Sequence, residues 1–304
     1  MSIKVLVIGF GSIGKRHADI LNSMDVVSSV TVLSRQINLP YETLTSLEEV
    51  SKLNPDYIVI ASNTALHYKQ LAFLEKSLQG KKILVEKPLF DSFYDFEIVA
   101  NHVFVGYDLR FHPLVQLIKK KTAERNIWNI QVFCGSYLPD WRPGRDYRET
   151  YSAKKNDGGG VLLDLSHEID YVRWIAGPLK AEHVCSCKVS DLDIETDDLL
   201  LFTGKSVPLA HVHISLNYFT RKPMRQIIID GQGISVQADL IANTLSVYED
   251  NEPSEYAWPD LDQNTAFLNQ HKAIIDGDLS SACNYKEGLE TMRLIDNIRP
   301  SLYT

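Results

Sequence analysis

Short apolar runs of strand length alternate with helix-like stretches over the first 110 residues of the chain. The apolar runs are residues 3–8, 30–34, 56–61, 83–85 and 102–105. The stretches between them that have helical spacing are residues 12–24, 44–53 and 65–78. Gly80 is placed to end the last of these helices. Because strands that alternate with helices form a parallel sheet covered by helices, we expect residues 1–110 to be an α/β domain with a doubly wound parallel sheet.

The pattern after residue 110 is that of an α+β domain. Helices are expected at residues 113–125, 161–175, 264–275 and 286–298. Strands are expected at residues 128–136, 183–189, 198–203, 209–219, 225–230, 234–239 and 244–248. Strands that follow one another without helices between them form hairpins. We therefore expect residues 111–304 to be a second domain with an open, mostly antiparallel sheet.

The composition is that of an ordinary globular protein. A length of 304 residues suits two domains. The chain has 31 Lys and Arg residues against 39 Asp and Glu residues, a net charge of −8, which does not favour nucleic-acid binding. Within the first strand, the uninterrupted apolar stretch is residues 5–8, which is far too short for a secretory or membrane-spanning segment. We expect a cytoplasmic protein that binds neither nucleic acid nor membrane.

The four cysteines make a weak case for a metal site. Cys134 and Cys283 are isolated, whereas Cys185 and Cys187 lie two apart in an expected strand, where they would share a face. Two thiolates without further ligands are not a typical metal site. We interpret all four as reduced structural thiols and expect no metal.

A glycine-rich loop follows the first strand. Its sequence is Gly9-Phe10-Gly11-Ser12-Ile13-Gly14. The first glycine permits a tight turn, the second lets a pyrophosphate approach the backbone, and the third allows close helix packing, while the helix N-terminus faces the phosphates. The motif alone is weak, but here a strand precedes it and a helix follows it, which predicts a dinucleotide site.

The end of the second strand bears on the choice of cofactor. An acidic residue there would bind the ribose 2′-hydroxyl of NAD. This chain instead has Ser34 and Arg35, a hydroxyl and a guanidinium that suit a 2′-phosphate. We expect NADP(H) to be favoured over NAD(H). The alternatives are that Arg35 is a solvated loop residue or stacks on the adenine of either cofactor.

Glu86-Lys87-Pro88 follows the apolar run at residues 83–85. A lysine at such a strand end can hydrogen-bond a substrate hydroxyl and ease the loss of its proton, while a nicotinamide accepts the hydride from the same carbon. The motif therefore indicates dehydrogenase chemistry. The alternative is a strand-end lysine whose ammonium group simply reaches solvent.

Taken in order, these motifs resemble those of the glucose-fructose oxidoreductase, inositol dehydrogenase and rhizopine-catabolism family, Gfo/Idh/MocA. The resemblance runs over nearly the whole chain. Its elements are the Gly9–Gly14 loop, Asn63-Thr64 with His67, Glu86-Lys87-Pro88, Gly106-Tyr107 with Arg110-Phe111, Gly158-Gly159-Gly160 leading to Asp164 and to His167-Glu168-Ile169-Asp170, and Lys286-Glu287-Gly288-Leu289. It implies an N-terminal Rossmann domain, and a C-terminal sheet with one face for substrate and commonly another for subunit contacts, so that we expect a homodimer or homotetramer.

The resemblance also implies site residues. The expected cofactor-binding residues are Gly9, Gly11, Ser12, Ile13, Gly14, Ser34, Arg35, Ser62, Asn63, Thr64, His67, Glu86 and Lys87. The expected catalytic residues are Lys87, Asp164 and His167. Family members usually separate the aspartate and histidine by three residues, whereas here two residues separate them; both spacings lie on one helical face. Glu168, four residues after Asp164, is a further candidate.

The roles of the three catalytic candidates follow from their chemistry. We expect His167 to be the acid/base, since an unperturbed histidine pKa of about 6.5 lets it take and return a proton near neutrality. Asp164 would orient the imidazole, and Lys87 would hydrogen-bond the reacting oxygen. Lys87 is the competing candidate for the proton transfer. A histidine on a helix face that merely bonds to its neighbours is the alternative for His167.

The loop at residues 140–148 gives clues to the substrate. Arg142, Arg145 and Arg148 alternate there with Trp141 and Tyr147, close to Tyr151. Arginines bind carboxylates or phosphates, and aromatic rings stack on sugars or bases. Together with Lys87, Arg110, Asp164 and His167, we expect Trp141, Arg142, Arg145 and Tyr147 to bind substrate. Alternatively, the loop arginines pair with Asp140, Asp146 and Glu149 or make subunit contacts, and Arg110 braces the domain junction.

The function predicted from these observations is hydride transfer between NAD(P) and a secondary alcohol or ketone of a sugar. An anionic sugar is favoured: a nucleotide-linked sugar, a uronic acid or a nonulosonic acid used in glycan biosynthesis. A cyclitol (inositol-type) dehydrogenase is the alternative within the enzyme class. A non-catalytic NADP-binding sensor is the alternative outside it.

Overall fold

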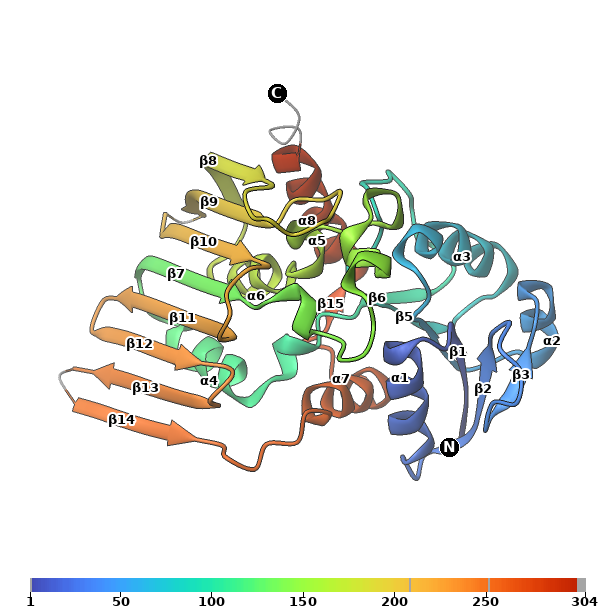
Figure 1. Cartoon of the computed structure of the whole chain (residues 1–304). Helices are drawn as coiled ribbons and strands as arrows, with labels where there is room; N and C mark the ends of the chain where they lie inside the picture. The colour runs from blue at the N-terminus through green and yellow to red at the C-terminus, as the bar shows by residue number, and fades with distance from the viewer. Residues whose placement is uncertain (1, 208, 251, 300–304) are drawn as a thin grey trace. The chain divides into compact units, whose positions relative to one another are not determined.

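The computed structural model describes residues 2–207, 209–250 and 252–299 (Figure 1). It contains two compact units. The first is the chain up to Phe111 together with Asn264–Met292, and the second is His112–Gln263 together with the chain from Arg293 onward. The units therefore differ from the expected ranges 1–110 and 111–304 mainly in one segment, because Asn264–Met292 packs with the N-terminal unit.

The first unit is built on a seven-stranded sheet in the order β15-β6-β5-β4-β1-β2-β3. Its strands are β1 (Ile3–Ile8), β2 (Val27–Leu33), β3 (Glu42–Leu44), β4 (Tyr57–Ile60), β5 (Lys82–Val85), β6 (His102–Val105) and β15 (Cys283–Asn284). All neighbours are parallel except β15, which is antiparallel to β6. The strand order reverses beside β1, which is the usual place for a ligand in a doubly wound sheet.

The helical elements of the first unit follow the predicted pattern, with local differences. They are α1 (Ser12–Asn22), η1 (Leu47–Glu49), α2 (Val50–Leu53), α3 (Thr64–Ser77), η2 (Asp108–Phe111) and α7 (Thr265–Asp276); α8 (Tyr285–Ile298) ends the described chain. Ser46 caps η1 in a reciprocal capping box with Glu49. Gly80 does have a left-handed φ of 71°, but α3 already ends at Ser77.

The second unit contains an eight-stranded sheet in the order β14-β13-β12-β11-β7-β10-β9-β8. Its strands are β7 (Ile127–Gly135), β8 (Leu179–Cys187), β9 (Leu199–Ser206), β10 (His211–Asn217), β11 (Met224–Gly231), β12 (Ile234–Asp239), β13 (Thr244–Glu249) and β14 (Glu252–Ala257). Neighbouring strands are antiparallel except β7 and β10. The sheet is open and mostly antiparallel, as predicted.

One face of this sheet is covered by helices. The covering helices are α4 (Pro113–Thr122), α5 (Val161–Asp164) and α6 (His167–Ala176), which lie together on one side of the strands in Figure 1. Val212, Ile214 and Leu216 of β10 are buried on the covered face, whereas His211 and His213 point to the open face. The alternation of apolar and polar residues along a strand therefore indicates which of its faces packs against helices.

The expected single helix over residues 161–175 is wrong in one respect: it is interrupted. α5 ends at Asp164, Leu165 leaves the helical conformation with φ −101° and ψ 30°, and α6 begins at His167. The N–H of Ser166 bonds to the carbonyl of Leu163, three residues back instead of four. Asp164 and His167 therefore lie on two successive helices and not on one continuous helical face.

The polar segment that contains the predicted loop at residues 140–148 has four short 3₁₀ turns. They are η3 (Leu138–Asp140), η4 (Tyr147–Glu149), η5 (Tyr151–Ala153) and η6 (Lys155–Asp157). Asp146 caps η4 by accepting the N–H of Arg148. Short turns with local caps give this segment a defined shape without a long helix or strand.

Candidate active site

The glycine loop between β1 and α1 has the geometry of a phosphate-binding turn. Gly9 has φ +98°, and a Cβ there would lie 2.7 Å from the carbonyl oxygen of Ala61. A Cβ on Gly14 would lie 2.2 Å from the carbonyl oxygen of Gly9, so close helix packing requires a glycine. A Cβ on Gly11, in contrast, would meet no atom within 4 Å. Gly11 therefore borders open space at the point where a pyrophosphate has to approach the backbone.

The N-terminus of α1 is suited to an anion. Gly11 is its N-cap and provides no side-chain cap, and the first turn holds no acidic residue. The N–H groups of Ser12 and Ile13 therefore start a helix whose positive dipole end faces outward without a competing carboxylate. The residues present fit a dinucleotide cofactor, with Gly11, Ser12 and Ile13 placed to hold its phosphates.

The next strand ends contribute polar groups beside this loop. At the end of β2, the Ser34 hydroxyl accepts the N–H of Gln36 at 3.1 Å, and the Gln36 side chain donates to the Phe10 carbonyl at 2.9 Å. Arg35 is exposed and has no side-chain partner within the described ranges. An exposed guanidinium beside a hydroxyl at this strand end is compatible with binding a ribose 2′-phosphate and with the solvated alternative.

The residues after β4 are organised around the start of α3. Asn63 is the N-cap, and its side chain accepts the N–H of Ala65 at 3.3 Å. The Ser62 hydroxyl donates to Gln70 at 2.7 Å. Ser62 and Asn63 are thus fixed at the same edge of the sheet as the glycine loop, because the carboxyl ends of parallel strands share one edge.

Lys87 follows β5 at this edge, and two expected cofactor residues turn into the protein on either side of it. The Glu86 carboxylate is 6% exposed and accepts a hydrogen bond from His17 at 2.9 Å. His67 is 1% exposed, with Nδ1 3.2 Å from the carbonyl oxygen of Pro88 and Nε2 3.2 Å from that of Ser62. Burial lowers the pKa of His67, although its carbonyl partners oppose this. Both side chains make internal contacts that bear on the Lys87 backbone.

Arg110 is buried and occupies a structural position in the first unit. Its guanidinium Nη1 donates to Glu287 Oε2 at 3.0 Å. The contact joins two segments of the predicted family pattern, Arg110-Phe111 and Lys286-Glu287, that lie far apart in sequence. Arg110 therefore braces η2 against the start of α8.

In the second unit, Asp164 lies at the centre of a group of aromatic residues. Its carboxylate is 4% exposed and accepts the Tyr218 hydroxyl at 2.6 Å. The charge of Asp164, burial, and a hydrogen bond to the same carboxylate raise the pKa of Tyr151. The Trp141 ring meets Tyr218 edge to face at 5.2 Å, and the Arg142 guanidinium lies 5.2 Å from the centre of the Tyr151 ring. A carboxylate among aromatic faces is a typical arrangement for binding a sugar.

Sequence reasoning did not single out Tyr218. It follows β10 and is fully buried, and its only signal in the sequence is a polar aromatic residue at the end of an alternating strand. Its contact with Asp164 joins residues 54 positions apart. Such a contact depends on the pairing of distant segments, which local pattern does not report.

His167 and Glu168 differ in their surroundings. His167 is the first residue of α6 and is partly exposed. Glu168 is fully buried and bonds to Arg225 Nε at 2.7 Å. Although burial opposes it, the charge of Glu168 helps to raise the pKa of Arg225 above its ordinary value. Glu168 is therefore committed to a structural ion pair and is not free for the supporting role considered for it.

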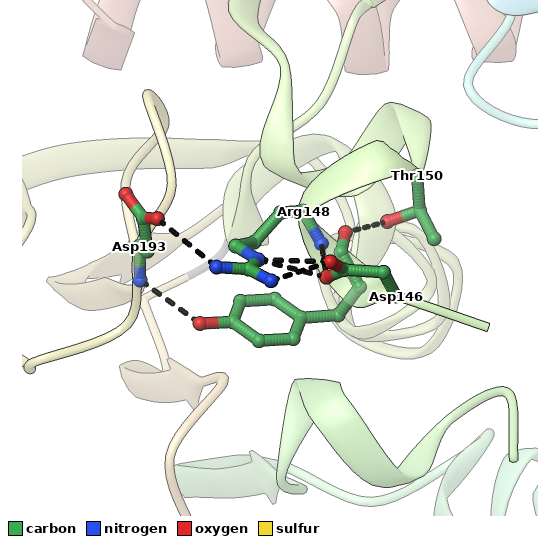
Figure 2. Close-up of polar contacts among 5 residues, drawn as sticks. Asp146, Arg148, Thr150 and Asp193 are labelled. Atoms are coloured by element: carbon green, nitrogen blue, oxygen red, sulfur yellow. Dashed lines mark hydrogen bonds and ion pairs between the residues drawn. The ribbon is translucent and has the colours of Figure 1, made fainter. Parts of the chain in front are cut away.

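The arginines of the 140–148 loop divide into two groups, and Figure 2 shows the first, Arg148 with its partners Asp146 and Asp193. Arg148 makes a bidentate contact with Asp146, at 2.9 Å from Nε and 2.6 Å from Nη2, and lies 3.8 Å from Asp193. The Tyr147 hydroxyl accepts the N–H of Asp193 at 3.1 Å. The alternative pairing with a loop aspartate therefore holds for Arg148. Arg142 and Arg145 border a small hollow that Trp141 and Tyr147 also line.

Two further properties bear on function. In the part of the chain that the structure describes, no group of three His, Cys, Asp or Glu side chains is arranged to hold a metal ion. Over the same residues, no helix combines the length and the apolar character needed to cross a membrane. Lys87 belongs to the first unit, and Asp164 and His167 belong to the second.

Comparison with known proteins finds a family model that matches the N-terminal third of the chain. Residues 3–103 match the model of an oxidoreductase family with an NAD-binding Rossmann fold, GFO_IDH_MocA. A levoglucosan dehydrogenase of Pseudarthrobacter phenanthrenivorans is 31% identical over 140 residues, which cover 42% of this chain and 35% of that protein. The matched segments span less than half the length of this and the other curated relatives.

Solved structures share the fold over nearly the full length. Levoglucosan dehydrogenase in complex with NADH and levoglucosan has a TM-score of 0.84 at 16% identity, covering 99% of this chain and 97% of that one. The WlbA dehydrogenase from Bordetella pertussis in complex with NADH and UDP-GlcNAcA has a TM-score of 0.77 at 19% identity, covering 99% and 96%. A super-repressor mutant of Gal80p from Saccharomyces cerevisiae has a TM-score of 0.82 at 15% identity, covering 99% and 96%. At these identities the likeness shows the fold alone. The match identifies residues 3–103, with the dinucleotide-binding loop within them, as an NAD-binding Rossmann domain like that of the Gfo/Idh/MocA oxidoreductases.

Proposed function

We propose that the protein is an NAD(P)-dependent oxidoreductase that acts on a secondary alcohol or ketone of a sugar, with an anionic sugar as the preferred substrate. The observation that carries the proposal is the Asp164 group, in which a buried carboxylate, Tyr218, Tyr151 and Trp141 meet beside Arg142. Support for the cofactor comes from the family match and from the open approach to Gly11.

Each catalytic candidate has a defined task in this proposal. Bound nicotinamide would accept or supply the hydride. Lys87 hydrogen-bonds the reacting oxygen, and His167 takes and returns its proton, since an imidazole can do both near neutral pH. Asp164, held by Tyr218, orients the imidazole or a sugar hydroxyl. Lys87 remains the competing proton carrier, and the pH dependence of Lys87→Arg and His167→Gln turnover distinguishes the two.

The anionic character of the substrate rests on Arg142 and Arg145. Arg148 forms ion pairs with Asp146 and Asp193. In contrast, Arg142 lies against the Tyr151 ring, and Arg145 is exposed without a carboxylate partner in the described chain. A substrate carboxylate or phosphate would supply the counter-charge that the protein does not. The complex of WlbA with UDP-GlcNAcA is consistent with such a substrate within this fold.

A substrate panel tests the proposal. Reduced-nicotinamide absorbance would be followed with nucleotide-linked uronic acids, nucleotide-linked neutral sugars, free uronic and nonulosonic acids, levoglucosan and inositol. Arg142→Gln and Arg145→Gln should raise KM for an acidic sugar at least tenfold, while Lys154→Gln, which removes an exposed charge from the same unit, should not. Turnover confined to neutral cyclitols and unaffected by either arginine change would favour the cyclitol alternative.

We further propose that the cofactor preference is for NADP(H). The proposal is supported by Ser34 and Arg35, which directly follow β2, where no carboxylate is present to bind the ribose 2′-hydroxyl of NAD. Arg35→Ala should reduce the affinity for NADP(H) and leave that for NAD(H) within about twofold, with Lys52→Ala as the control for loss of an exposed charge. An unchanged ratio of affinities in Arg35→Ala would remove Arg35 from the argument.

A non-catalytic sensor is the second candidate, because Gal80p shares the fold. A sensor would bind NADP(H) and sugar without changing the absorbance of either nicotinamide form. The resemblance of the chain further supports a homodimer or homotetramer, which sedimentation would measure.

A further inference from the structure

Four buried polar side chains of the first unit form a continuous path that ends beside Lys87. Tyr57 OH lies 2.9 Å from His271 Nδ1, His271 Nε2 lies 2.8 Å from His17 Nδ1, and His17 Nε2 lies 2.9 Å from Glu86 Oε1. None of the four residues is more than 6% exposed. We call these residues, Tyr57, His271, His17 and Glu86, the Tyr57–Glu86 path.

The donor and the acceptor of every hydrogen bond in the path can be assigned by starting from Tyr57. Burial, with the charge of Glu86, raises the pKa of Tyr57, so the phenol keeps its proton. Its contact with His271 is the one hydrogen bond that it makes among the described residues, so Tyr57 donates to His271 Nδ1. A neutral imidazole has one donor and one acceptor nitrogen. His271 Nε2–H then donates to His17 Nδ1, and His17 Nε2–H donates to Glu86.

The neutral state of His271 is consistent with this direction. Burial and the neighbouring His17 hold the pKa of His271 well below its ordinary value. All three bonds point toward Glu86, so every donor and acceptor along the path is used and the one carboxylate receives the last proton donor. A buried polar path of this kind is stable only when each member is satisfied.

Glu86 transmits this arrangement to the main chain of Lys87. Its second carboxylate oxygen, Oε2, accepts the N–H of Lys87 at 3.3 Å. A Cβ on Gly106 would lie 2.6 Å from Oε1, so the neighbouring strand end closes the space around the carboxylate. On the far side of Lys87, His67 Nδ1 lies 3.2 Å from the Pro88 carbonyl and 3.3 Å from that of Leu89. The backbone is thus held both before and after Lys87.

We propose that the Tyr57–Glu86 path positions Lys87 for its reaction, with His271 of α7 as the element that fixes its geometry. The proposal rests on the proposed function only in the claim that Lys87 acts on substrate. Tyr57, His17 and His271 are positioning residues, because they act through Glu86. A buried network without this contact would affect stability alone, whereas this path holds the main-chain N–H from which the Lys87 side chain extends.

The test follows Lys87 directly and needs no substrate. The lysines of the full-length protein would be reductively methylated with ¹³C-formaldehyde, and the Lys87 resonance would be assigned by its loss in Lys87→Arg. In Glu86→Gln the Lys87 resonance should change its chemical shift, because the carboxylate that accepts the Lys87 N–H is replaced by an amide. In Tyr57→Phe it should move in the same direction by less. Tyr41→Phe removes a matched hydroxyl from the same unit, one that bonds to Asp19, and should leave the resonance unchanged.

A second arm uses whichever substrate the panel identifies. Turnover should fall about 10- to 100-fold in Glu86→Gln and several-fold in Tyr57→Phe, since small misplacement of a catalytic group has effects of this size. In Tyr57→Phe the Kd for cofactor should stay within about twofold of the wild-type value. If folded Glu86→Gln and Tyr57→Phe both leave the Lys87 resonance at its wild-type chemical shift, the positioning proposal is overturned. If instead Lys87 responds but no substrate turns over, the positioning stands and the proposed function fails. Should Glu86→Gln not fold, the isosteric Tyr57→Phe alone decides.

Discussion

Asp197 is predicted to make the folded state less stable as the pH rises, which is the reverse of the usual pH dependence for an aspartate. Its main-chain carbonyl accepts the N–H of Val161 at 3.1 Å, and its carboxylate accepts the N–H of Leu162 at 3.1 Å. A Cβ on Gly160 would lie 2.2 Å from Asp197 Oδ1, so the carboxylate is pressed against the start of α5. Burial, assisted by the charge of Asp164, raises the pKa of Asp197 to about 6, against the opposing effect of the Leu162 N–H.

The sign of the pH dependence follows from this shift. A carboxyl with a raised pKa holds its proton more tightly in the folded state, so its contribution to stability is fully present below pH 3.8 and is lost as the pH rises through about 6. The rise from 3.8 to about 6, at about 1.4 kcal/mol for each pKa unit, amounts to about 3 kcal/mol. Asp197→Asn keeps the neutral form at every pH. The variant should therefore match the wild type near pH 4 and exceed it by up to about 3 kcal/mol at pH 8.

Thermal unfolding followed by near-ultraviolet circular dichroism at several pH values measures this difference. For a unit of this size, about 3 kcal/mol corresponds to a rise in Tm of about 6–12 °C at pH 8. Asp191→Asn removes an exposed carboxylate from the same unit and controls for net charge. Equal pH dependence of Tm in Asp197→Asn and the wild type would refute the assignment of a raised pKa to this partly buried carboxyl.

Three further predictions concern the cofactor loop, the buried ion pair and a helix cap. Gly11→Ala should fold normally but weaken NAD(P) binding at least tenfold, because its Cβ would enter the open space through which the pyrophosphate approaches the backbone. Gly14→Ala should yield little folded protein, because its Cβ would lie 2.2 Å from the Gly9 carbonyl oxygen. Circular dichroism measures the folding of both variants, and isothermal titration measures cofactor binding by Gly11→Ala. Glu168→Gln should lower the free energy of unfolding in urea by about 3 kcal/mol or more, since it leaves Arg225 beside an uncharged partner, and an unchanged urea midpoint would contradict the ion pair. Asn63→Ala should cost about 1 kcal/mol in the same assay, and Asn63→Asp, which keeps the cap acceptor, should recover most of it.

The sequence predicted elements whose own side chains drive their formation. The run at residues 3–8 became β1 with the same bounds, because four consecutive residues of it are buried between helical layers. β14 was missed because Glu252-Pro253-Ser254-Glu255-Tyr256-Ala257 has no apolar alternation. It exists through backbone pairing with β13 at the edge of the sheet, where polar residues and proline are tolerated.

The parts of the site that sequence did not reveal depend on distant contacts. Spacing suggested one helix through Asp164 and His167, but the chain leaves the helix at Leu165, where Asp164 is engaged by Tyr218. The pairing of Arg148 with Asp146 is local, two residues apart, and was among the alternatives considered. The association of α7 with the first unit was not predictable, since helical periodicity shows which face is apolar and not which partner covers it.

His17 is a buried polar residue whose position in the sequence pattern indicates a functional or structural partner. It lies among buried positions of α1, with Gly14, Ala18 and Leu21, and a polar residue in such a stripe needs a buried partner. Its partners, Glu86 and His271, are 69 and 254 positions away, so only the structure could identify them.

The same network bears on whether the protein is a catalyst or only a binding protein. Binding a dinucleotide requires the turn at Gly9, the open approach at Gly11 and the donors at the start of α1, and a protein that merely senses cofactor needs no more. Burying two histidines, a tyrosine and a carboxylate carries a desolvation cost that hydrogen bonds must offset. Here that arrangement ends at the main chain of one lysine, which His67 holds from the other side. A lysine held in this way is useful where the position of its ammonium group governs a reaction rate, so the network favours catalysis over sensing.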